Sequence, residues 1–259
     1  GGSDSPGRNP PVPLSRSADL GVDLFYNLTP SLRANLTVNT DFAQTEVDQR
    51  LVNLTRFPLF FPEKRDFFLD GATFFEFYVP RRRQNSNIAV QPFFSRRIGL
   101  DANGLPQKID FGTKLTGQLG QQDVGFLHVR TGDESTLVGE DFTVLRLKRR
   151  VLAQSYVGMF YSRRASRTIA SSPEQTAGLD FRLATSTFRG SNNLEFSGFL
   201  LWNTDTAKTT PGDNLAYGVR LDYPNDRWEA RVSFTEVQPD HGPAMGFTRR
   251  TGFRAYQPR

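Results

Sequence analysis

The amino-acid sequence predicts an all-β fold: an antiparallel meander that forms a partial transmembrane β-barrel of the outer-membrane type, with an irregular, aromatic-rich insert. Segments of alternating apolar and polar residues recur along the 259 residues, and this period of two places side chains on opposite faces of strands. Short turns between these segments alternate with longer polar linkers, as in outer-membrane barrels. No apolar run approaches the roughly 18 residues of a membrane-spanning helix, whereas a barrel strand needs only one apolar face.

Composition and pattern divide the chain into four regions. Residues 1–16 are rich in Gly, Ser, Pro and Arg and contain neither an initiator Met nor an apolar signal-peptide stretch, which predicts a flexible linker in a fragment of a longer chain. Residues 17–56 are predicted as the first barrel hairpin, 57–100 as a Phe-rich insert with its return segment, and 101–259 as further barrel hairpins.

The first hairpin follows from two alternating segments around a turn. The first segment covers residues 20–28, the turn is Thr29-Pro30-Ser31, and the second segment covers residues 32–47. Proline and serine at the turn break the ladder and supply local hydrogen bonds, so the chain is expected to reverse there.

The insert at 57–78 departs from the strand pattern. Pro58 and Pro62 lack an amide donor and prevent a continuous ladder or helix, so a compact non-strand element is expected. Its aromatic residues are Phe57, Phe60, Phe61, Phe67, Phe68, Phe74, Phe75, Phe77 and Tyr78. One interpretation is a plug or lid that packs against the inside of the barrel; the other is a platform whose rings stack on a sugar or another ring.

Six later segments share the alternating design: 109–119, 145–148, 179–183, 194–202, 217–223 and 228–234. Short connections at 120–123, 189–192 and 224–226 are expected to be hairpin turns. Their apolar positions are predicted to face acyl chains and their charged positions to line the lumen. The predicted lumen-lining residues are Asp110, Lys114, Arg146, Lys148, Asp180, Arg182, Glu195, Arg220, Asp222, Glu229 and Arg231.

A soluble β-sandwich is the alternative, because its strands also alternate. Two observations favour the barrel. The polar face carries opposite charges two residues apart, as in Asp180 and Arg182, which can interlock between strands inside a lumen. Aromatic residues such as Trp202 and Trp228 lie near the ends of predicted strands, where interfacial girdles form.

Several function classes have little support. The chain has no cysteine, so disulfides, thiolate metal sites and cysteine nucleophiles are excluded. His128 is expected to be a polar lumen or packing residue, and carboxylates such as Glu63 and Asp70 are expected to be solvated or ion-paired rather than catalytic. The chain carries 32 Lys+Arg against 27 Asp+Glu, but its arginine doublets are scattered, so nucleic acid is not expected as a partner. No cofactor or metal is predicted.

Several motifs resemble one family. They are NTDFAQTEVD at 39–48, NLTRF at 53–57, FFPEKRDFFLD at 60–70, FFSRRIG at 93–99, GTKLTG at 112–117, LRLKR at 145–149, AYG at 216–218 and GFTRRTGFR at 246–254. Together they are similar to a family of bacterial outer-membrane β-barrels of unknown function, whose members commonly carry a carbohydrate-binding family 9-like domain ahead of the barrel. The resemblance implies the bacterial outer membrane as location. The resemblance also implies that the upstream domain and the later strands of that pattern lie outside these 259 residues, as expected for a fragment.

The expected function is the binding or passage of a solute through a charge-lined lumen, with a carbohydrate as a candidate ligand and outer-membrane lipid and glycolipid as partners. Two alternatives stay open. One is a cell-surface carbohydrate-processing hydrolase that the barrel anchors. The other is a structural scaffold for an upstream carbohydrate-binding domain.

Overall fold

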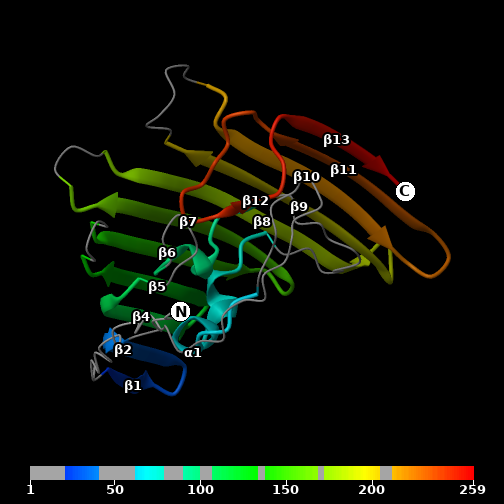
Figure 1. Ribbon diagram of the computed structural model, residues 1–259. Helices are drawn as coiled ribbons and strands as arrows, with labels where there is room; N and C mark the ends of the chain where they lie inside the picture. Colours follow the sequence, from blue (N-terminus) through cyan, green and yellow to red (C-terminus); the bar gives the residue numbers. More distant parts are fainter. Residues whose placement is uncertain are drawn as a thin grey trace, which may run out of the picture.

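The computed structural model describes residues 21–40, 62–78, 90–99, 107–133, 138–168, 172–204 and 212–259. Eleven strands form one antiparallel sheet in the order β1-β2-β4-β5-β6-β7-β8-β9-β10-β11-β13 (Figure 1). Their bounds are β1 Val22–Thr29, β2 Leu32–Thr40, β4 Ile109–Leu119, β5 Gln122–Thr131, β6 Glu140–Val151, β7 Ser155–Ser166, β8 Glu174–Phe188, β9 Asn192–Asn203, β10 Leu215–Pro224, β11 Glu229–Val237 and β13 Phe253–Pro258.

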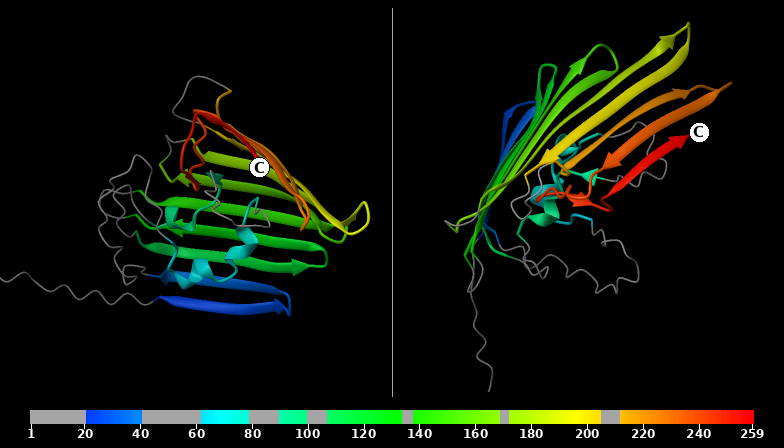
Figure 2. Two further views of the ribbon diagram at one scale, coloured as in Figure 1. Left: turned by 90° about the vertical axis from the view of Figure 1, so that its right-hand side faces the viewer. Right: turned by 90° about the horizontal axis from the view of Figure 1, so that it is seen from above.

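The predicted antiparallel meander is confirmed. Each strand of the large sheet pairs with its neighbours in chain order, and the sheet stays open, with β1 and β13 at its two edges. The first hairpin pairs β1 with β2, and its turn falls at the predicted Pro30 and Ser31. The open, curved sheet is consistent with part of a barrel wall (Figure 2).

Connection length alternates along the meander. Short turns at 30–31, 120–121, 152–154, 189–191 and 225–228 join strands at one end of the sheet, and longer connections at 41–108, 132–139, 167–173, 204–214 and 238–252 join them at the other. We name these the short-turn end and the long-loop end. Glycine explains two of the short turns, because Gly120 and Gly190 adopt positive φ angles that most other residues avoid.

The insert lies on the concave side of the sheet (Figure 2). Its described part contains the single-turn helix α1 (Asp66–Leu69) and the 3-10 turn η2 (Ala72–Phe75). The return segment contains β3 (Val90–Gln91) and the 3-10 turn η3 (Ser95–Arg97), and β3 pairs with β12 (Phe247–Thr248). Among the described residues, no helix is both long and apolar enough to cross a membrane.

Some predictions fall outside the described residues. They are the flexible linker at 1–16, Phe57, Phe60 and Phe61 of the insert, and the end of the predicted second strand beyond Thr40.

Candidate functional site: a plugged, charge-lined concave face

The convex face of the sheet is apolar and exposed. Strand alternation directs one set of side chains outward on every strand, and no other described segment covers this face (Figure 2). The outward residues with the most exposed side chains include Val22, Leu24, Tyr26, Leu36, Val38, Val157, Met159, Leu179, Leu183, Phe196, Leu200, Trp202, Val219, Leu221, Val232 and Tyr256. The result is an apolar band, which we call the convex band, that extends from one edge of the sheet to the other.

The concave face carries most of the strand charges, while the ion pairs Arg130–Asp141 and Arg254–Glu236 lie on the convex face. All of the predicted lumen residues except Asp110 project to the concave face: Lys114, Arg146, Lys148, Asp180, Arg182, Glu195, Arg220, Asp222, Glu229 and Arg231. Asp110 differs because it lies in a bulge between Ile109 and Phe111, where the register with β5 shifts. The same bulge turns Ile109 inward, where it is fully buried, although the sequence pattern had assigned it to the apolar outer face.

The most deeply buried charges form a bidentate pair. Arg146 on β6 donates from Nη1 to Oδ1 of Asp180 at 2.6 Å and from Nη2 to Oδ2 at 2.9 Å, and these two side chains are 1% and 0% exposed. Both also bind the insert, because Arg146 Nε donates to the Glu76 carbonyl and the Tyr78 amide donates to Asp180. The pair therefore attaches the insert to the middle of the wall.

Lys114 on β4 makes a second attachment. Its ammonium group donates to the backbone carbonyls of Phe67 and Asp70, which the end of α1 leaves without helical partners. Asp70 in turn accepts hydrogen bonds from Arg33 and Asn35 on β2. Although burial opposes ionisation, these hydrogen bonds and the nearby Lys114 and Arg33 charges lower the pKa of Asp70.

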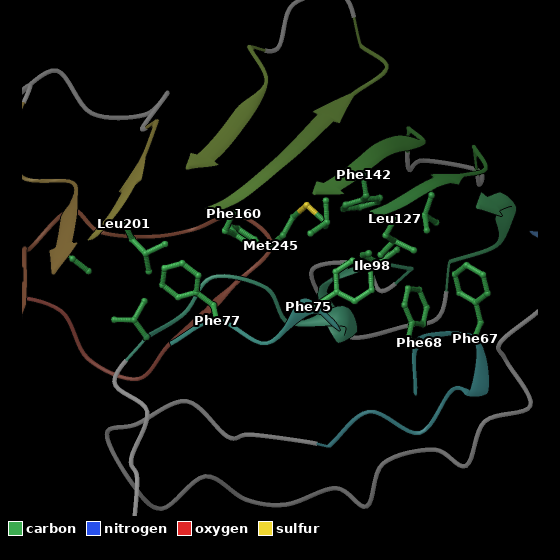
Figure 3. Close-up of a cluster of buried hydrophobic side chains, with 14 of the residues drawn as sticks. Phe67, Phe68, Phe75, Phe77, Ile98, Leu127, Phe142, Phe160, Leu201 and Met245 are labelled. Carbon is green, nitrogen blue, oxygen red and sulfur yellow. The ribbon is translucent and has the colours of Figure 1, made fainter. Parts of the chain in front are cut away.

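The aromatic rings of the insert fill the space between these attachments. Phe67, Phe68, Phe75 and Phe77 are buried, while Phe74 and Tyr78 are half-buried (Figure 3). The rings meet apolar wall residues that include Leu127, Phe142, Phe160 and Leu201.

Glycines on the wall make room for the rings. A Cβ on Gly112 would lie 3.1 Å from the Phe67 ring, and a Cβ on Gly125 would lie 3.1 Å from the Phe75 ring. A Cβ on Gly178 would lie 3.2 Å from the Phe77 ring. The wall is therefore shaped to receive the insert.

A buried ion pair joins the start of the insert to the return segment. Arg65 donates to both carboxylate oxygens of Glu63, at 2.9 and 2.8 Å, and to the carbonyls of Ser95 and Ile98. The Ser95 hydroxyl donates to Glu63 at 2.6 Å. Burial by itself would raise the pKa of Glu63, but the Arg65 and Ser95 hydrogen bonds and the Arg65 charge outweigh it and lower that pKa to about 2.

An open pocket of about 360 Å³ remains between strands β8 to β11. Its lining residues are Ala184, Thr185, Asn193, Leu194, Glu195, Arg220, Asp222, Pro224 and Arg231. Four of these are predicted lumen residues. Asp222 accepts hydrogen bonds from Arg220 and Arg231, and Tyr78 of the insert lies close enough for the Arg220, Asp222 and Glu195 charges to act on its hydroxyl. Burial raises the pKa of Tyr78.

Sequence reasoning missed the apolar part of the concave face. Leu127, Val129, Phe142, Val144 and Phe160 project inward and are almost fully buried. A signal was present, because the runs 126–129 and 199–202 contain apolar residues at inward as well as outward positions. A strand covered on both faces has such a run, so it marks where the insert packs.

The two histidines have packing roles. His128 lies on the convex face and not on the concave face that was predicted to line a lumen; its Nδ1 is 3.0 Å from the Thr143 hydroxyl and its ring packs beside Phe111. His241 is buried in the connection after β11, with Nδ1 3.1 Å from the Asn214 carbonyl, and burial lowers its pKa.

Fold and site together define a class: an open, antiparallel β-wall with an apolar convex face and a charged concave face that holds a folded insert. Over residues 10–119 the chain matches the family model described as Domain of unknown function (DUF5916), which covers the first hairpin, the insert and β4. No curated protein and no solved structure gives a match.

Proposed function

We propose that this chain forms part of the wall of a bacterial outer-membrane β-barrel, whose lumen is partly closed by the insert and binds or passes a small polar solute. The observation that carries the proposal is the distribution of polarity. Buried ion pairs lie on the concave face, and apolar side chains are exposed on the convex face. A protein dissolved in water has the opposite arrangement.

The size of the convex band supports lipid as its environment. Apolar patches on soluble proteins rarely exceed a few hundred Å², and the exposed residues of this band lie on eight of the eleven strands. Acyl chains are an occupant that matches it, because lipid-facing barrel strands present alternating apolar residues. A second sheet is the soluble alternative, and it would have to cover the whole band.

The two ends of the sheet support an orientation. Bacterial barrels have short turns on the periplasmic side and longer loops outside, so the short-turn end is assigned to the periplasm. Trp202 lies at the long-loop end of β9, and Trp228 is the last residue of the short turn before β11. Both are exposed, as expected for rings at the two headgroup regions.

Tryptophan fluorescence tests the lipid contact directly, because the chain has only these two tryptophans. Single-tryptophan variants Trp202→Phe and Trp228→Phe are refolded into vesicles whose lipids carry bromine close to the headgroup or deep in the acyl chain. Shallow bromine should quench the remaining tryptophan in each variant more strongly than deep bromine. Fluorescence that neither lipid quenches would refute the membrane location.

A further inference from the structure

The concave face of β7 to β11 has two halves with different contents. At the long-loop half, Phe77 and Tyr78 of the insert pack against Phe160, Phe199 and Leu201. At the short-turn half, the pocket of about 360 Å³ lies open and is lined mainly by polar side chains. This pocket, which we call the chamber, therefore lies on the short-turn side of Tyr78.

Strand register orders the charges of this chamber into two levels. At the level nearer the insert, Arg182, Ser197 and Arg220 are direct neighbours across β8, β9 and β10. At the next level, Glu195 and Asp222 are direct neighbours, and Asp222 also pairs with Arg231 of β11. Each level is two residues from the other along a strand, which is roughly 6–7 Å.

These charges largely neutralise one another. Asp222 accepts from Arg220 Nε, from Arg220 Nη2 at 2.9 Å and from Arg231 Nε at 2.6 Å. Glu195 lies 3.9 Å from Arg182 Nε, a nitrogen that is buried and makes no hydrogen bond within the described residues. A charged ligand would have to break a formed pair, and a hydrophobic ligand would leave the lining groups unsolvated.

An uncharged, hydroxyl-rich solute meets neither obstacle. Each hydroxyl group both donates and accepts, so one solute can bind the remaining guanidinium N–H groups and carboxylate oxygens without separating the pairs. The side-chain amide of Asn193 adds a neutral donor and acceptor to the lining. A volume of about 360 Å³ suits one or two sugar rings, within the range of small-molecule pockets.

We propose that this chamber is a binding site for a neutral polyhydroxylated solute of monosaccharide to disaccharide size. The proposal deepens the proposed solute function and rests on it for access from the short-turn side. It assigns the ligand contacts to Glu195, Arg220, Asp222, Arg231 and Asn193.

The test uses the full chain refolded in detergent micelles, with glucose and maltose as probes in isothermal titration calorimetry. Ala184→Phe places a ring in the chamber beside Glu195, its cross-strand neighbour, without removing a charge. Asn193→Leu removes the side-chain amide and keeps the backbone hydrogen bonds to Asn225. Leu183→Phe, one residue away on the convex face, is the matched control.

We expect maltose or glucose to bind with a Kd of about 1–10 mM. The affinity should fall about tenfold or more in Ala184→Phe and Asn193→Leu, and it should not change in Leu183→Phe. Glucose 1-phosphate and alanine, an anion and a zwitterion, should bind more weakly. Tighter binding of either comparator, equal binding in all variants, or no sugar binding would overturn the proposal. If any of these three outcomes is found while bromolipids still quench the tryptophans, only the ligand assignment has failed and the proposed membrane location stands.

Discussion

Introducing a positive charge on the convex band tests whether lipid or water surrounds that face, because the cost in unfolding free energy differs between the two. Val219 is the fifth of ten residues in β10, projects outward and is 44% exposed. In water, Val219→Arg at such a position should change the free energy of unfolding by no more than about 0.5 kcal/mol. Near the middle of a bilayer the same substitution should cost about 2–4 kcal/mol.

The control arginine substitution must lie on the concave face, at the same level along the strands as Val219. Gly218, the adjacent concave position, is unsuitable, because a Cβ there would lie 2.8 Å from the Phe234 carbonyl and 2.9 Å from the Phe199 ring. Ser233 on β11 is better, since it pairs with Arg220 one residue along from Val219 and is half-buried on the concave face. Ser233→Arg keeps its charge on the hydrated side and should cost less than about 1 kcal/mol.

The assay is a urea titration of the full chain refolded into phospholipid vesicles, followed by tryptophan fluorescence. A difference of about 2 kcal/mol or more between the two variants is expected. Equal costs at Val219 and Ser233 would refute the lipid-facing assignment and restore the soluble β-sandwich as the better interpretation.

Three further predictions concern the insert. Arg146→Met leaves the buried Asp180 carboxylate without its partner and should cost about 3–5 kcal/mol in the same titration, whereas the double variant Arg146→Met/Asp180→Leu should recover part of that loss; no recovery would contradict the pairing. Gly125→Val places methyl groups against the Phe75 ring and should destabilise by about 1–3 kcal/mol, with increased hydrogen exchange at 66–78; unchanged exchange would contradict the packing. Glu63 has a folded pKa of about 2 against 4.5 unfolded, so its contribution is complete above about pH 4.5 and is lost as the pH falls through about 2. Proteolysis of the insert should therefore increase over that range, and Glu63→Gln should lose most of this pH dependence.

Much of the wall was predictable because local chemistry decides it. Alternation in segments such as 179–183 assigns each side chain to one face, and turn-forming residues set hairpins, so the meander order and the faces of the predicted lumen residues other than Asp110 follow from sequence. The hydrogen-bond and ion-pair partners of those charged residues cannot be predicted from the sequence in the same way. Lys114 bonds to backbone carbonyls of the insert, and no sequence pattern encodes which carbonyls a distant turn leaves free.

Contacts between distant parts of the chain also determine the features that the sequence pattern did not predict. Ile109 turns inward because a bulge shifts the register by one residue, and a one-residue shift changes the face. Glu63, Arg65 and Ser95 come together only because the return segment folds against the start of the insert. The pocket depends on the same kind of packing, because its lining residues come from four different strands, β8 to β11.

The parity of the meander constrains how such a wall can close. β1 and β13 are the first and last of eleven successively antiparallel strands, so both run from the long-loop end to the short-turn end. Direct pairing of these two edges would therefore be parallel. In hydrocarbon every edge N–H and C=O group needs a partner, so an all-antiparallel closed wall requires an odd number of additional strands between the edges, whichever chain supplies them. The total is then even, as in bacterial single-chain barrels.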